Sequence, residues 1–126
     1  VRSSAASDVY KRQKDHGRNN RIEGRLEPGA KVVVIEDLIS TAGSCIEVVE
    51  ALREAGAEVL GVVSIFTYGM KKGLDRLEAA GVRNVSLSNL DVLLDVAAEE
   101  GYIGAADKEA IRKFRDNPSD ESWFKA

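Results

Sequence analysis

The chain alternates between two spacings of hydrophobic residues from Arg25 onward. Short apolar runs rich in β-branched residues predict strands over 31–36, 59–66 and 84–87. Between and after them, apolar residues recur every three or four positions and predict helices over about 43–55, 71–80, 92–99 and 107–115. Because strands and helices alternate, we expect an α/β fold: a parallel Rossmann-like sheet with flanking helices.

The first two predicted helices each have one apolar face. Ile46, Val49 and Leu52 share a side of the first helix, and Leu74 and Leu77 share a side of the second. We expect both faces to pack on the sheet. The four consecutive β-branched residues 32–35 are expected to form a buried strand within it.

Two carboxylates, Glu36 and Asp37, follow the first apolar run. This is the expected carboxyl end of a parallel strand, which is where open α/β sheets bind ligands. Adjacent acids repel a phosphate, but they accept hydrogen bonds from sugar hydroxyls or hold a divalent cation through water. For an isolated acid pair, a solvated strand end would be the simpler interpretation.

The segment that follows has the composition of a phosphate-binding loop. Ser40, Thr41 and Ser44 supply hydroxyl donors, and Gly43 allows the backbone to approach a ligand closely. A helix that begins near Ser44 points its free N–H groups and positive dipole end at an anion. Helix capping alone would explain the hydroxyls. A phosphorylated ribose, however, matches both the loop and the acid pair, so the sequence predicts a ribose-phosphate site.

Composition and charge narrow the class of protein. The 126 residues are 44% apolar and 31% charged, as in an ordinary single globular domain. No stretch has the length and apolarity of a membrane span or of a secretory signal, so we expect a cytoplasmic protein without a membrane partner. The single cysteine, Cys45, excludes an internal disulfide, and we expect it to pack behind the loop.

Charge is distributed unevenly along the chain. Residues 1–25 carry a net charge of +4 and residues 26–126 a net charge of −7. A basic arm on an acidic body is one signature of nucleic-acid binding. Aromatic residues do not interleave the basic ones and no helix-turn-helix pattern is visible, so we expect no nucleic-acid partner.

Two segments together resemble a known family. The run from Val32 to Ser44 resembles the phosphoribosyl pyrophosphate (PRPP) loop of type I phosphoribosyltransferases: an apolar strand, two acids, two mostly apolar residues, then hydroxyl residues with glycine. Lys14-Asp15-His16-Gly17, with 20–24 and the Pro28-Gly29 turn, resembles the mobile catalytic loop of orotate phosphoribosyltransferases. The resemblance covers residues 14 to about 126.

The resemblance implies a pentosyltransferase that moves the phosphoribosyl group of PRPP to orotate, giving orotidine 5′-phosphate and pyrophosphate in pyrimidine synthesis. It implies that Lys14 and His16 are catalytic, because both can interact with the pyrophosphate leaving group. It implies PRPP contacts from Lys14, His16, Glu36, Asp37, Leu38, Ile39, Ser40, Thr41, Ala42, Gly43 and Ser44, with Ser40 also touching orotate. It further implies Mg²⁺ held by PRPP with no direct protein ligand, and a homodimer that shares the catalytic loop.

The sequence departs from the family pattern in three respects. Residues 1–13 lack a core period and resemble adapter or vector sequence, so we expect them to be foreign and residues 14–126 to be the carboxyl-terminal part of the domain. The family's amino-terminal region, which covers orotate, is not in this chain, so we expect the chain alone to be inactive. After the second predicted strand the chain reads Phe66-Thr67-Tyr68-Gly69, where some members place an arginine for the orotate carboxylate.

Two other functions fit the same loop. A PRPP-sensing regulator would bind the ligand without transferring it, although a sensor needs no leaving-group cation such as Lys14. A phosphoribosyltransferase for another base would share the loop and differ only in the region that contacts the base.

Overall fold

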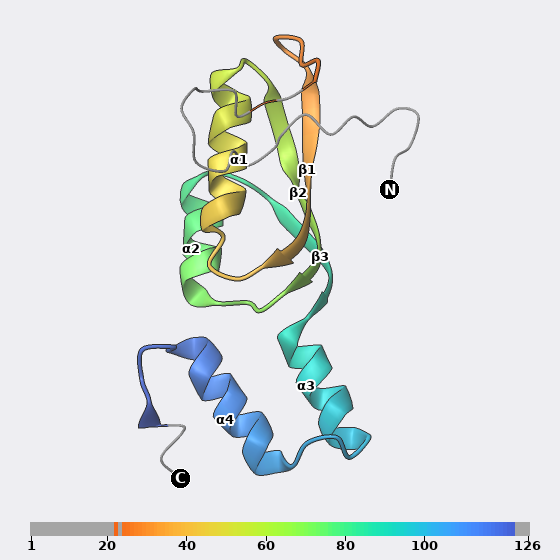
Figure 1. Ribbon diagram of the computed structural model, residues 1–126, viewed down its shortest axis with the longest axis vertical. Coiled ribbons are helices and arrows are strands. Elements are labelled where there is room, and N and C mark those ends of the chain that lie inside the picture. The colour runs from red at the N-terminus through yellow and green to blue at the C-terminus, as the bar shows by residue number, and fades with distance from the viewer. Residues whose placement is uncertain (1–21, 23, 123–126) are drawn as a thin grey trace.

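The computed structural model describes residue 22 and residues 24–122 (Figure 1). Within them lie three strands, β1 (Lys31–Ile39), β2 (Glu58–Thr67) and β3 (Asn84–Asn89). Four helices, α1 (Gly43–Glu54), α2 (Lys71–Ala79), α3 (Leu90–Glu99) and α4 (Ala105–Asp116), complete the order β1-α1-β2-α2-β3-α3-α4. The predicted succession of elements is therefore confirmed.

The strands form one parallel sheet in the order β1-β2-β3. All the strands continue beyond their predicted ends, and β1 runs on through the acidic pair to Ile39. A register shift between Val32 and Val33 marks a bulge near the start of β1. The predicted α/β class is confirmed. The carboxyl end of β1, however, lies two residues beyond Asp37.

Helices α1 and α2 cover one face of the sheet (Figure 1). The core between these layers is built mainly of side chains from β1, β2 and the two helices. Its buried members are Val34, Ile39, Ala42, Cys45, Val48, Val49, Leu52, Ala57, Val62, Leu77 and Val82. The predicted inner face of α1 is confirmed at Val49 and Leu52, which are buried, whereas Ile46 is only partly buried.

The opposite face of the sheet is exposed in the described part of the chain. Ile35 is 71% exposed and Leu87 is 77% exposed, and Val33 and Val85 are also exposed. The prediction that 32–35 is a buried strand is wrong for Val33 and Ile35. Alternate residues of a strand point to opposite faces, and only the face toward α1 and α2 is covered by described residues.

The predicted inner face of α2 is also partly wrong. Leu77 is 4% exposed, but Leu74 is 55% exposed. The residue that α2 buries one position before Leu74 is Gly73, which lies against the β1–α1 loop. The helix is therefore turned so that a glycine, and not a leucine, makes the close contact.

The orientation of α2 predicts that Leu→Ala substitutions at positions 74 and 77 have unequal effects on the free energy of unfolding. We expect Leu77→Ala to lower the free energy of unfolding by about 2–4 kcal/mol, because it leaves a cavity in the core. Leu74→Ala changes helix propensity equally but removes an exposed side chain, so we expect a loss below about 1 kcal/mol. Urea unfolding of both variants checks this, and equal losses would contradict the packing of α2.

Helices α3 and α4 form a hairpin below the carboxyl ends of the strands in Figure 1. Asn89 caps α3, its side-chain oxygen accepting a hydrogen bond from the Val92 N–H at 3.0 Å. Arg115 of α4 forms two hydrogen bonds, of 2.9 and 3.1 Å, with the Asp91 carboxylate of α3. The hairpin therefore lies at the same end of the sheet as the predicted site.

Candidate functional site

The connection between β1 and α1 is a three-residue turn, 40–42. Its last residue, Ala42, is left-handed with φ 63° and ψ 9°, a conformation that a residue with a Cβ rarely adopts. The Ala42 methyl is buried in the core, and its carbonyl accepts the Ile46 N–H at 2.9 Å. Because packing fixes a strained residue here, the turn has one defined shape.

The first turn of α1 offers free hydrogen-bond donors. The N–H groups of Gly43, Ser44 and Cys45 precede the first intrahelical bond, and no side chain of the described residues caps the helix. No acidic residue lies in this turn either, so the positive end of the helix dipole is not neutralised there. Ser44 is exposed and Thr41 is half-buried. Free N–H groups at a helix amino terminus suit an anion, and the predicted phosphate binding at this turn stays a prediction.

The two carboxylates lie on opposite faces of β1, because they are consecutive residues within the strand. Glu36 is half-buried on the face toward α1. Asp37 is exposed on the other face, and its Oδ1 accepts the Leu38 N–H at 2.7 Å. The two acids therefore point to different faces of the strand and do not form a side-by-side pair on one face.

The remaining predicted contact residues differ in what they offer. Leu38 is 42% exposed, and Ile39 is buried at 3% exposure, so Ile39 can offer a ligand only its backbone. Ser40 is exposed at the start of the turn. Lys14 and His16 lie outside the described residues, so their predicted place in the site stays a prediction.

Burial controls the ionisation of two groups behind the loop. The pKa of Glu36 is raised above its usual range by burial and then by the negative charge of Asp37. Burial and then the charge of Glu36 raise the pKa of the Cys45 thiol to about 11. Cys45 is 3% exposed, so it is a protonated packing residue at neutral pH, as expected, and not an activated thiol.

The raised pKa of Glu36 predicts a pH-dependent stability difference. A carboxyl group whose pKa is higher in the folded state binds its proton more tightly there, so stability falls as the pH rises through its titration range. We expect Glu36→Gln to be more stable than the wild type at neutral pH, by less than about 1 kcal/mol because solvent screens a half-buried charge. The difference should vanish at a pH where Glu36 is protonated. Thermal unfolding across pH measures it, and a variant less stable at neutral pH would contradict this ionisation.

The loop after β2 supports the end of β1. The Ile39 carbonyl accepts the Tyr68 N–H at 3.0 Å and a longer bond from Thr67 Oγ1 at 3.4 Å. Thr67 Oγ1 in turn accepts the Gly69 N–H at 3.2 Å. Arg115 Nη1 donates to the Tyr68 carbonyl at 3.2 Å, which ties this loop to α4. The segment 66–69 thus holds the end of β1, just before the 40–42 turn, through a backbone N–H and the Thr67 hydroxyl.

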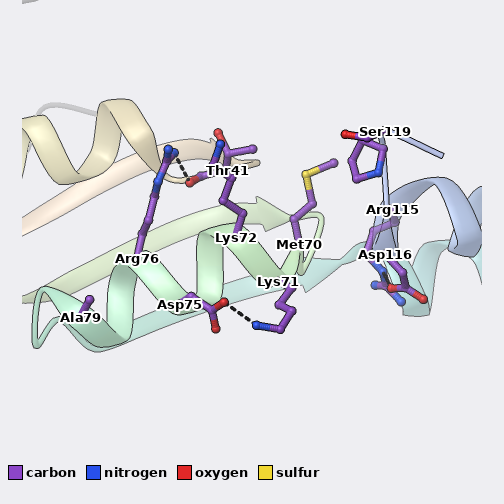
Figure 2. Close-up of a pocket in the computed structure, with 11 residues that line it drawn as sticks. Thr41, Met70, Lys71, Lys72, Asp75, Arg76, Ala79, Arg115, Asp116 and Ser119 are labelled. Atoms are coloured by element: carbon purple, nitrogen blue, oxygen red, sulfur yellow. Dashed lines mark hydrogen bonds and ion pairs between the residues drawn. The ribbon is translucent and has the colours of Figure 1, made fainter.

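Helix α2 contributes contacts that the sequence reasoning missed. A Cβ at Gly73 would lie 2.6 Å from the Ser40 carbonyl oxygen, so only glycine allows this approach. Figure 2 shows Arg76 pointing at the turn, and its Nη1 donates to the Thr41 carbonyl at 2.9 Å. The signal available in the sequence was Gly73 itself, because glycine is unfavourable inside a helix unless packing requires it.

A pocket of about 690 Å³ opens beside these contacts (Figure 2). Its lining combines the turn, α2 and the chain after α4. The residues are Thr41, Met70, Lys71, Lys72, Asp75, Arg76, Ala79, Arg115, Asp116, Pro118 and Ser119. Lys71 pairs with Asp75 at 2.6 Å, and Arg115 pairs with Asp91 and Asp116. The lining also includes Lys72 and Arg76, so cationic side chains gather on this wall beside the 40–42 turn.

No cluster of three His, Cys, Asp or Glu side chains within 22 and 24–122 has the arrangement of a metal site. Among the helices in this part of the chain, none has the length and apolarity needed to cross a membrane.

Comparison with known proteins identifies the family. The model of the phosphoribosyl transferase domain family matches residues 8–97, a range that begins within the segment 1–13 expected to be foreign. That expectation stays untested. The chain is 56% identical over 118 residues to the orotate phosphoribosyltransferase of Bacillus cereus (strain G9842), covering 94% of this chain and 56% of the relative. It thus spans about half the length of the curated relatives that it matches.

Solved structures agree with the sequence match. Leishmania donovani UMP synthase has a TM-score of 0.63 at 29% identity, covering 75% of this chain and 21% of that one. Mycobacterium tuberculosis H37Rv orotate phosphoribosyltransferase in complex with PRPP has a TM-score of 0.52 at 32% identity, covering 58% of this chain and 43% of that one. With the sheet, the turn and the family match in agreement, the chain belongs to the phosphoribosyl transferase domain family.

Proposed function

We propose that this chain supplies the PRPP-binding part of an orotate phosphoribosyltransferase. The observation that carries the proposal is the fixed turn at 40–42, which leads into the uncapped amino terminus of α1. The 56% identity to an orotate phosphoribosyltransferase supports orotate as the acceptor. The reaction breaks the bond between the anomeric carbon of PRPP and its pyrophosphate and forms a bond from that carbon to a nitrogen of orotate, which gives up its proton.

Each group in the site has a role in this proposal. The hydroxyls and N–H groups of 40–44 hold the 5-phosphate, and Ser40 also touches orotate. Glu36 and Asp37 accept hydrogen bonds from the ribose hydroxyls, one from each face of β1. Leu38 and the backbone of Ile39 line the approach to this site. The 40–44 segment, Glu36 and Asp37 hold the sugar phosphate at three points. This orients the anomeric carbon toward the base.

The leaving group is the second requirement. Lys14 and His16 stabilise the negative charge that develops on pyrophosphate, as cation and hydrogen-bond donor. Mg²⁺ enters this proposal as an ion carried by PRPP, with no direct protein ligand. It would add positive charge to the pyrophosphate oxygens.

Assembly and location follow from the same resemblance. We propose a homodimer, in which the loop with Lys14 and His16 reaches the partner's site, in the cytoplasm. We propose neither a nucleic-acid nor a membrane partner.

A chimaeric enzyme tests the proposed function. This chain replaces the matched segment of the Bacillus cereus relative, and orotate consumption is followed with PRPP and Mg²⁺, the unaltered relative being the control. We expect the chimaera to consume orotate. Tight PRPP binding without turnover would favour the sensor, and turnover only with a purine would favour a transferase for another base.

A further inference from the structure

The conformation of the turn at 40–42 depends on the residues packed around it. Ala42 is the one residue other than glycine with positive φ in the described part of the chain, and no side chain caps α1. Such a conformation persists only when its surroundings hold it. The contacts around the turn therefore decide whether its donors face a ligand.

Helix α2 supplies that support from one face. Gly73 and Arg76 are three residues apart, so both lie toward the turn. Gly73 packs directly under the Ser40 carbonyl, and Arg76 Nη1 donates to the Thr41 carbonyl at 2.9 Å. Two successive residues of the turn are thus held by one helix, and Figure 2 shows the bond from Arg76 to Thr41.

Arg76 brings a positive charge to the start of α1, in addition to its hydrogen bond with Thr41. A Cβ at Gly43, the first residue of α1, would lie 3.2 Å from Arg76 Nη1, so the guanidinium adjoins the free N–H groups. Within the described residues Arg76 forms no ion pair, unlike Arg115, whose charge is balanced by Asp91 and Asp116. A half-buried, unbalanced guanidinium beside an anion site raises the affinity for an anion.

We propose that Arg76 is a positioning residue that holds the 40–42 turn in its ligand-binding shape and adds positive charge for a sugar phosphate. This inference rests on the proposed function, because it names a residue of the same site. Helix α2 then contributes to the affinity for the ligand, in addition to the acid pair and the turn.

The matched control is Arg53. Its Nη1 also donates to a backbone carbonyl across the α1–α2 layer, that of Ala80 at 2.6 Å, but from the opposite end of α1. PRPP binding to the whole chain is measured calorimetrically for the wild type, Arg76→Met, Arg76→Lys and Arg53→Met. We expect Arg76→Met to weaken binding at least tenfold, Arg76→Lys to recover part of it, and Arg53→Met to match the wild type.

The possible failures can be told apart. If the wild type does not bind PRPP, the proposed function fails and this inference fails with it. If the wild type binds and Arg76→Met binds equally well, or Arg53→Met loses as much, only this inference is overturned. Should Arg76→Met unfold, Arg76→Gln is measured instead, because it keeps a donor for Thr41 and removes the charge. Binding by Arg76→Gln as tight as by the wild type would show that the charge has no part.

Discussion

Gly73→Ala is expected to lower the free energy of unfolding by about 1–3 kcal/mol, against the usual preference of helices for alanine. Alanine normally stabilises a helix interior by about 1 kcal/mol relative to glycine. At position 73 the added Cβ would lie 2.6 Å from the Ser40 oxygen, so α2 or the turn must move. Because Ser40 begins the 40–42 turn, which we propose binds the 5-phosphate, we also expect weaker PRPP binding.

Glu78 provides the control for Gly73. It is exposed on the same helix, so Glu78→Ala should be more stable than Glu78→Gly by about 1 kcal/mol, the ordinary order. Urea unfolding of the four proteins, including the wild type, gives both comparisons. If Gly73→Ala equals or exceeds the wild type in stability, the close approach of α2 to the turn is wrong.

Asp37→Asn is expected to weaken PRPP binding at least tenfold while changing the free energy of unfolding by less than about 0.5 kcal/mol. The carboxylate is exposed and makes one local bond, to the Leu38 N–H, so folding depends little on it. Binding depends on it because a charged acceptor forms stronger hydrogen bonds with sugar hydroxyls than an amide does.

Glu58→Gln is the matched substitution for Asp37. Glu58 is an exposed carboxylate at the amino end of β2, far along the sheet from the turn, so its loss should leave PRPP affinity unchanged. Calorimetric titration and thermal unfolding of both variants separate binding from stability. An Asp37→Asn variant that loses both equally would count against a ligand role.

The sequence predicted the parts of this structure that depend on local pattern. Alternating apolar spacings gave the order of strands and helices, and the hydroxyl- and glycine-rich segment gave a helix that begins beside a turn. The single cysteine was correctly expected to pack behind that turn, where Cys45 is buried.

What the sequence could not provide depends on tertiary contacts. The apolar spacing of α2 favoured Leu74 as a core residue, but the close approach of Gly73 to Ser40 turns the helix and leaves Leu74 exposed. The acid pair looked like a strand end because its charge interrupts an apolar run. Pairing with β2 carries β1 on to Ile39 and places Glu36 and Asp37 on opposite faces.

The central claim is that the amino terminus of α1 binds a sugar phosphate, and NMR titration tests it most directly. The ¹⁵N-labelled chain is titrated with ribose 5-phosphate and, separately, with ribose, while the backbone amide resonances are followed by NMR. We expect saturable shifts at Gly43, Ser44 and Cys45 with ribose 5-phosphate and none with ribose. Equal shifts with both compounds, or no shift at these amides, would contradict it.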